Sequence, residues 1–170
     1  MSVMEIIDSE TLYKDQRFFL NETSWDKLES IDSKLSAVVQ HAIGMSDIEF
    51  QVLEGRRTKA MHDALYTKGV TQDAIHSAHF YGMAVDLIVY IEGRPIIEVE
   101  PYRDVAQCMQ YAAEYVGTPI QWGGCPHVHD LRGNRAFYED LTNDFFDICR
   151  SQDLPKTPTI NPHHFEIPVE

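Results

Sequence analysis

The chain has 170 residues, enough for one domain with a substantial hydrophobic core and too few for two. Its 14 basic and 27 acidic residues give a formal net charge of −13 at pH 7, with no basic stretch to neutralise phosphates. This balance argues against a nucleic-acid partner and against tight electrostatic docking on anionic membranes. No apolar run reaches transmembrane length and residues 1–8 lack the features of a signal peptide, so we expect no stable membrane association. Three widely spaced cysteines favour synthesis in a reducing cytoplasm over a disulfide framework.

The first half of the chain predicts a helix, a strand and a second helix. Thr23 opens a capping pair, and apolar residues then recur at helical spacing up to Gly44, so we expect a single helix between these positions. Alternating apolar residues over 48–52 predict a strand. A short helix that ends at Gly69 follows.

The next elements centre on a strand over residues 84–91. A turn connects this strand to a returning strand at 95–97, where a proline favours a sheet edge. An amphipathic helix is then expected to begin at Asp104 and to end at Gly117, before a short strand over 118–122.

The last elements are a helix and a short strand over 164–167. The helix is expected to bury four apolar residues at helical spacing: Phe137, Leu141, Phe145 and Ile148. The sequence thus predicts an α+β class, with a mostly antiparallel sheet flanked by helices in a single small domain. We expect residues 1–22 to form an N-terminal extension and residues 23–170 to form the folded domain, as a monomer.

The stretch from Ser77 to Asp86 carries the clearest chemical signal; it reads Ser-Ala-His-Phe-Tyr-Gly-Met-Ala-Val-Asp. We expect a loop that carries His79, bends at Gly82 and leads into the strand that contains Asp86. An imidazole and a carboxylate that converge in this way can hold a divalent metal, zinc above all, and they can equally form a structural hydrogen bond. A metal site therefore needs a third ligand from elsewhere in the chain.

The candidate third ligand is His164, in the segment Asn161-Pro-His-His-Phe-Glu166. With the Ser77-x-His-x-x-Gly-x-Ala-x-Asp86 motif, the Trp122-Gly-Gly sequence and the final His-Phe-Glu, the chain resembles the zinc peptidoglycan peptidases of the D-alanyl-D-alanine carboxypeptidase group. Within that group it is most similar to the phage L-alanyl-D-glutamate endopeptidases, which serve as endolysins. The resemblance covers nearly the whole chain, and the first motif is its most specific part.

The resemblance implies that His79, Asp86 and His164 bind Zn²⁺, with water in the fourth position. It also implies that Arg57 steadies the substrate and the developing oxyanion, and that Ser77 lies near the metal. The implied fold is that of the hedgehog and D-Ala-D-Ala peptidases, and the implied substrate is the stem peptide of peptidoglycan. Such an endolysin would be made in the host cytoplasm and would reach the cell wall after the membrane is permeabilised.

One position departs from the family pattern. The family places an Asp or Glu three residues before the last zinc histidine, as general base and acid, and this chain has Asn161 there. An amide cannot take a proton from water at neutral pH, so base catalysis by this group is lost. His163 or Glu166 could substitute, or the alignment could slip and bring in another acid such as Asp153. Otherwise the protein is a weak enzyme, or a zinc-holding wall-binding or virion protein without catalysis.

Two further alternatives remain open. A D-alanyl-D-alanine carboxypeptidase or dipeptidase would use the same metal site with a pocket shaped for a free carboxyl terminus. Separately, Cys125, His127 and His129 alternate in a pattern that can bind metal, but no second cysteine pair completes it. We expect those three residues to form a polar surface loop or a wall of the substrate groove.

Overall fold

A five-stranded sheet lies at the centre of the computed structural model, which describes residues 14–69, 77–152 and 158–169. The strands are β1 (Glu49–Glu54), β2 (Ala84–Ile91), β3 (Arg94–Ile96), β4 (Gln121–Trp122) and β5 (His164–Glu166). They follow the order β1-β2-β5-β4, β3 also pairs with β2, and every pairing is antiparallel. The predicted α+β class with an antiparallel sheet is confirmed.

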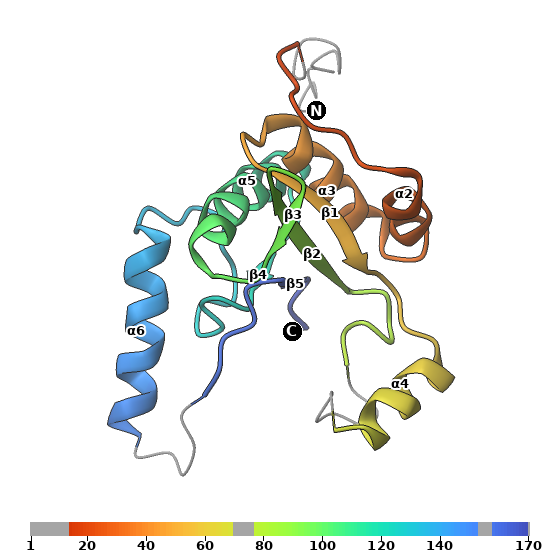
Figure 1. Cartoon of the computed structure of the whole chain (residues 1–170). Coiled ribbons are helices and arrows are strands. Elements are labelled where there is room, and N and C mark those ends of the chain that lie inside the picture. Colours follow the sequence, from red (N-terminus) through yellow and green to blue (C-terminus); the bar gives the residue numbers. More distant parts are fainter. Residues whose placement is uncertain (1–13, 70–76, 153–157, 170) are drawn as a thin grey trace, which may run out of the picture.

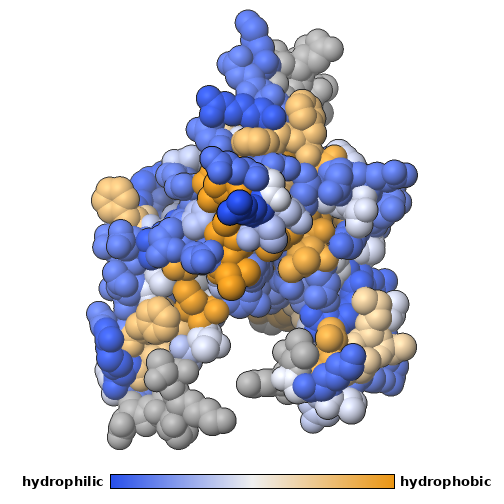
Figure 2. Space-filling view, viewed as in Figure 1, coloured by the Kyte–Doolittle hydropathy of each residue, from blue (hydrophilic) through white to orange (hydrophobic). Residues whose placement is uncertain are grey.

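Five helices surround this sheet in the described part of the chain (Figure 1). They are α2 (Glu22–Glu29), α3 (Ser33–Met45), α4 (Lys59–Thr67), α5 (Glu100–Val116) and α6 (Tyr138–Ser151). Helices α3 and α5 pack on each other, whereas α4 and α6 form two separate lobes at the lower edge of the view. Figure 2 shows that hydrophilic residues dominate this face and that hydrophobic ones gather near its middle. No helix of the described residues is long and apolar enough to cross a membrane.

Strand β2 separates the hydrophobic core from the opposite face of the sheet. Val85, Leu87 and Val89 belong to the core cluster, together with apolar residues of α2, α3 and α5. Because side chains alternate along a strand, Asp86 projects to the face away from this cluster. The alternation therefore places one carboxylate on a surface that the helices of the core leave free.

The predicted single helix up to Gly44 is wrong, because the structure has two helices with a break between them. Asn21, rather than Thr23, caps α2 by accepting a hydrogen bond from a backbone N–H. After the break, the Asp32 carboxylate accepts from the backbone N–H groups of Lys34 and Leu35 at 2.9 and 3.1 Å and so begins α3. Asp32, which the apolar spacing placed inside one long helix, is therefore the N-cap of α3.

Several other predictions also differ from the structure: the strand expected over 118–122 covers only Gln121–Trp122, and Ile148 is 40% exposed instead of buried. Helix α5 begins at Glu100, four residues before Asp104, because Pro101 suits the first turn of a helix. Phe137 is 80% exposed instead of buried, since it precedes α6 with an extended backbone and lies off the buried helical face. The adjacent Tyr138 is buried in its place. The ends of the short helix, of β2 and of α5 at Gly117 agree with prediction.

Replacing Asp32 by Ala is expected to lower the free energy of unfolding by about 1 kcal/mol, because two backbone N–H groups lose their cap. Urea unfolding measures this change. Asp26→Ala removes the same charge from an exposed position in α2 and serves as the control. Equal effects of the two substitutions would contradict the capping role.

Candidate metal centre

Asp86 and His164 face each other across the β2–β5 ladder, where they are direct partners. Directly opposed residues of an antiparallel pair project to the same side of the sheet, so the carboxylate and the imidazole meet on the face away from the core. The next pair, Val85 and Phe165, is fully buried on the other side. The Asp86 Oδ1 atom lies 3.0 Å from His164 Nδ1.

A turn over residues 78–83 brings His79 to the same carboxylate, as predicted. The Gly82 N–H donates to the His79 carbonyl oxygen at 3.2 Å, and Gly82 has a φ of 71° that favours glycine. A Cβ at this glycine would also lie 3.2 Å from the carbonyl oxygen of Ser30. The turn leaves His79 Nε2 3.1 Å from Asp86 Oδ1.

These three side chains form one compact set of donor atoms. One ligand atom from each lies within 4.8 Å of the others, and the two imidazole centroids are 5.1 Å apart. Ligands of a tetrahedral zinc ion, each about 2.1 Å from the metal, are about 3.4 Å from one another. Small outward movements from the present contacts would therefore admit an ion. Two imidazoles and one carboxylate are also the donor types of catalytic zinc sites with an open position.

A backbone carbonyl fixes the orientation of the His79 ring. His79 Nδ1 lies 2.9 Å from the carbonyl oxygen of Gly55, which can only accept, so Nδ1 donates to it and Nε2 is the nitrogen that faces Asp86 and could bind a metal. The chain passes so close to α2 here that a Cβ on Gly55 would lie 2.6 Å from the carbonyl oxygen of Lys27. The glycine thus permits the approach that orients the histidine.

Glu166 orients the ring of His164 as the Gly55 carbonyl oxygen orients the ring of His79. Its Oε2 atom lies 2.7 Å from His164 Nε2, on the same face of β5 because the two residues are two positions apart. This contact leaves His164 Nδ1 directed at Asp86, beside the free nitrogen of His79. Both rings are therefore held from behind by an acceptor, an arrangement typical of metal-binding histidines.

The charges in the cluster shift two pKa values in opposite directions. Burial favours the neutral carboxyl of Asp86, but hydrogen bonds from His164 and His79 outweigh burial and hold its pKa well below the usual range. Burial likewise favours the neutral ring of His164, but hydrogen bonds to Asp86 and Glu166 raise its pKa to about 9. Without a metal, the cluster thus holds one proton that a cation would replace.

Arg57 lies next to the cluster, as its backbone N–H donates to the His79 carbonyl oxygen at 3.0 Å. Its side chain is only 8% exposed, and its Nε atom pairs with the carboxylate of Glu54. Arg57 also lines a cavity of about 410 Å³, together with Arg56 and Lys59. The chain next to the cluster therefore carries a buried arginine whose charge Glu54 balances.

Comparison with known proteins places this architecture in a family. The family model for phage L-alanyl-D-glutamate peptidase matches residues 16–150. The chain belongs to this family. The L-alanyl-D-glutamate peptidase of Escherichia phage T5 is 22% identical over 133 residues, which cover 76% of this chain and 93% of the phage T5 protein. The fold is similar to that in the crystal structure of the Serratia marcescens L-Ala D-Glu endopeptidase ChiX, with a TM-score of 0.65, 21% identity, and coverage of 91% of this chain and 92% of ChiX.

The phage peptidase match includes Arg57, Ser77, His79 and Asp86, and it ends before the third ligand candidate. The pairing of β5 with β2 brings His164 to the cluster independently of that match. Sequence reasoning named all three clustered side chains. It could not reveal the carbonyl that orients His79, because a backbone acceptor has no residue type of its own.

The remaining predicted site residues lie around the cluster in different ways. Ser77 is half-buried, and its carbonyl oxygen accepts from Phe80 N–H at 2.9 Å, at the start of the turn that carries His79. Asn161 lies in the turn before β5, where its Oδ1 accepts from the His163 N–H at 3.3 Å.

The ring of His163 lies on the α5 side of the sheet. Its Nδ1 atom is 3.0 Å from the carbonyl oxygen of Leu87, and its ring packs edge-on against Tyr102 at a centroid distance of 4.7 Å. Tyr102 belongs to the hydrophobic core, whereas His164 faces the opposite side. Of the two groups that could replace the family acid, only Glu166 contacts the cluster. Asp153, the third named acid, lies outside the described residues.

The Cys125 segment contributes no second metal cluster among the described residues. Cys125 is fully buried, and burial raises the pKa of its thiol to about 12. At neutral pH the Cys125 thiol is thus protonated, and a protonated thiol is a poor metal ligand. The His127 ring stacks on Phe145 with centroids 6.0 Å apart.

Zinc binding at neutral pH is expected to displace a proton from His164, because its metal-free ring is protonated below about pH 9 and a ligand nitrogen must be neutral. Affinity should therefore rise with pH up to about 9 and fall as the pH is lowered. Calorimetry of zinc binding in two buffers of different ionisation enthalpy, repeated from pH 6 to 9, measures both effects. Zinc affinity that is independent of pH across this range would contradict the assignment.

Proposed function

We propose that this protein is a zinc-dependent peptidoglycan endopeptidase, an endolysin that hydrolyses the L-Ala–D-Glu bond of the stem peptide. The observation that carries the proposal is the cluster of His79, Asp86 and His164, found in a chain of the phage peptidase family. The choice of the L-Ala–D-Glu bond rests on the names of the phage T5 and Serratia proteins, both of which specify it. Zinc, when bound, would polarise the scissile carbonyl and lower the pKa of the attacking water toward neutrality.

Arg57 is suited to hold the substrate carbonyl or a substrate carboxylate. Glu54 fixes Nε of the guanidinium, Arg57 lines a cavity, and its backbone N–H is bonded to the carbonyl oxygen of His79. A buried and already oriented cation stabilises developing negative charge without a reorganisation cost at the moment of reaction.

Glu166 is the candidate acid that contacts the cluster, through His164 Nε2 on the side of the ring away from Asp86. In this proposal the glutamate side chain turns from His164 toward the metal position and accepts a proton from water as the C–O bond forms. When the C–N bond breaks, the same proton can pass to the departing amine of D-Glu, so that atoms and charge balance. In this proposal Glu166 replaces the acid that the family has at Asn161, and Asn161 itself supports the turn before β5.

The site of action follows from the substrate. We propose that the enzyme is made in the cytoplasm of the infected host cell, and that it acts on the wall after the membrane has been permeabilised. A monomer suffices for this reaction, because all the proposed ligands and Arg57 come from one chain.

Digestion of purified peptidoglycan tests the function directly. The zinc-loaded protein should release fragments with a new amino terminus at D-Glu, detected by mass spectrometry, and a chelator should stop their release. His164→Ala should lose both stoichiometric zinc and cleavage, whereas His129→Ala, outside the cluster, should keep both. Release of free D-Ala would instead indicate a carboxypeptidase, and tight zinc binding without cleavage would indicate a binding protein.

Glu166→Gln tests the proton-transfer role, because Gln keeps an oxygen that can accept from His164 but cannot act as a base. The expected loss in kcat is about 10²- to 10⁴-fold with zinc stoichiometry unchanged. Adding Asn161→Asp to Glu166→Gln should restore part of the rate by returning the family acid. Wild-type kcat in Glu166→Gln, with an unchanged pH profile, would assign proton transfer to another group.

A further inference from the structure

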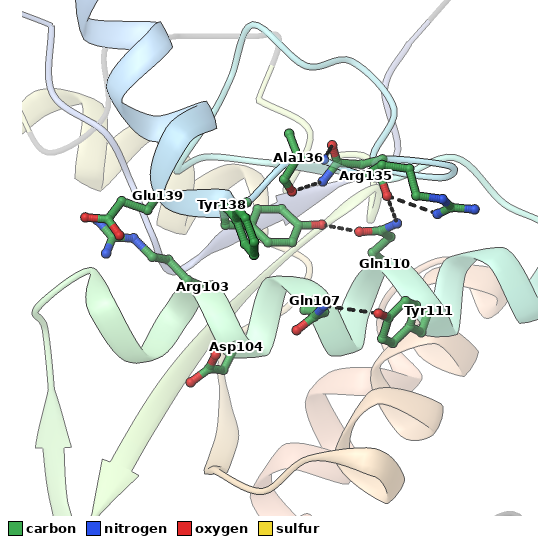
Figure 3. Close-up of a pocket in the computed structure, with 11 residues that line it drawn as sticks. Arg103, Asp104, Gln107, Gln110, Tyr111, Arg135, Ala136, Tyr138 and Glu139 are labelled. Atoms are coloured by element: carbon green, nitrogen blue, oxygen red, sulfur yellow. Dashed lines mark hydrogen bonds between the residues drawn. The ribbon is translucent and has the colours of Figure 1, made fainter.

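A second pocket lies between α5 and the loop that leads into α6, and it shares no residue with the metal cluster (Figure 3). Its volume is about 350 Å³. Figure 3 shows Gln107 and Tyr111 on α5, with Arg135 and Tyr138 coming from the loop and the start of α6. The proposed reaction uses none of these residues.

A series of hydrogen bonds, the first of them buried, connects the walls of this pocket. The Tyr138 hydroxyl donates to Gln110 Oε1 at 2.7 Å, and Gln110 Nε2 donates to the carbonyl oxygen of Asn134 at 3.0 Å. Asn134 Oδ1 in turn accepts from the Ala136 N–H at 3.0 Å. The loop is therefore fastened to α5 without any ligand, as is usual for pockets that bind small molecules.

The charges that line the pocket cancel. Arg103 and Arg135 contribute two positive charges, and Asp104 and Glu139 contribute two negative ones. Such a lining favours a neutral ligand that offers both donors and acceptors over a simple anion or cation. Arg103, which lines the pocket, has a buried Nε without an acceptor among the described residues.

Aromatic surface lies within the same polar pocket. Phe137 is 80% exposed and Tyr111 is 48% exposed, although both line the pocket walls. Exposed aromatic side chains beside polar groups mark recognition surfaces. A sugar ring matches this combination, because its hydroxyl and amide groups lie at the edge while its C–H groups form an apolar face.

We propose that this pocket binds an N-acetylated saccharide unit of the peptidoglycan glycan strand. The choice of saccharide rests on the proposed function. In peptidoglycan the L-Ala of the stem peptide is attached directly to a sugar, so an enzyme that cuts after this residue works next to the glycan. Because α5 lies on the core side of the sheet and the cluster on the other face, the pocket would hold a saccharide unit further along the strand than the one that carries the cleaved peptide.

The test uses the zinc-loaded full chain and chitohexaose, the hexamer of N-acetylglucosamine, which contains no peptide bond to cut. Nuclear magnetic resonance should show shifts at residues 103–111 and 134–139 on titration. Phe137→Ala should weaken this binding about tenfold, as expected when one aromatic contact is lost. Tyr66→Ala, which removes an equally accessible aromatic from α4 at 50% exposure, should leave it unchanged.

A second measurement separates this inference from the peptidase function. Phe137→Ala should slow cleavage of intact peptidoglycan and leave cleavage of a sugar-free stem peptide unchanged, since the pocket contacts only the glycan. If no variant cleaves any substrate, the peptidase function fails and the chitohexaose titration still decides the pocket. Absence of shifts at the pocket, or shifts produced there by the stem peptide instead of chitohexaose, would overturn the inference.

Discussion

One carboxylate oxygen organises the functional face of this protein. Asp86 Oδ1 contacts His79, seven residues earlier in the chain, and His164, 78 residues later. Without an ion, the attraction between the carboxylate and a protonated imidazole holds the two histidine segments together. An ion would take over the same role with stronger bonds. Three segments of the backbone position these groups: β2 carries the Asp86 carboxylate, the turn at Gly82 carries the ring of His79, and β5 carries the ring of His164.

Local sequence patterns predicted much of the fold because their physical causes are local. The apolar run after the histidine motif marked β2 to the residue, and the glycine after α5 marked its end. The errors arose where two local signals compete. Asp32 lies at a helical spacing between apolar residues, yet its carboxylate satisfies two backbone N–H groups better as a cap than within a helix. Phe137 fits a helical apolar stripe, but α6 begins one residue later and turns its buried face elsewhere.

The candidate site was predictable to a different extent for different residues. His79, Asp86 and His164 have chemically distinctive side chains, so a motif could name them before their positions were known. The role of Gly55 depends on a contact between distant loops that no spacing along the chain encodes, whereas Glu166 reaches His164 through the two-residue spacing of a strand. His163 and Glu166 were equal candidates by sequence, whereas the pleat of β5 and its neighbours separates them onto opposite faces.

The position of β5 has a consequence for biosynthesis. This three-residue strand carries His164, and it joins the sheet through pairings with β2 and β4, both of which are translated earlier. A ribosome-bound chain can therefore form most of the core while it still lacks one of the three donor side chains. Any product that ends before residue 164 would have the family's fold elements but an incomplete metal centre. The metal centre is therefore completed only after residue 164 has been translated and β5 has paired with β2.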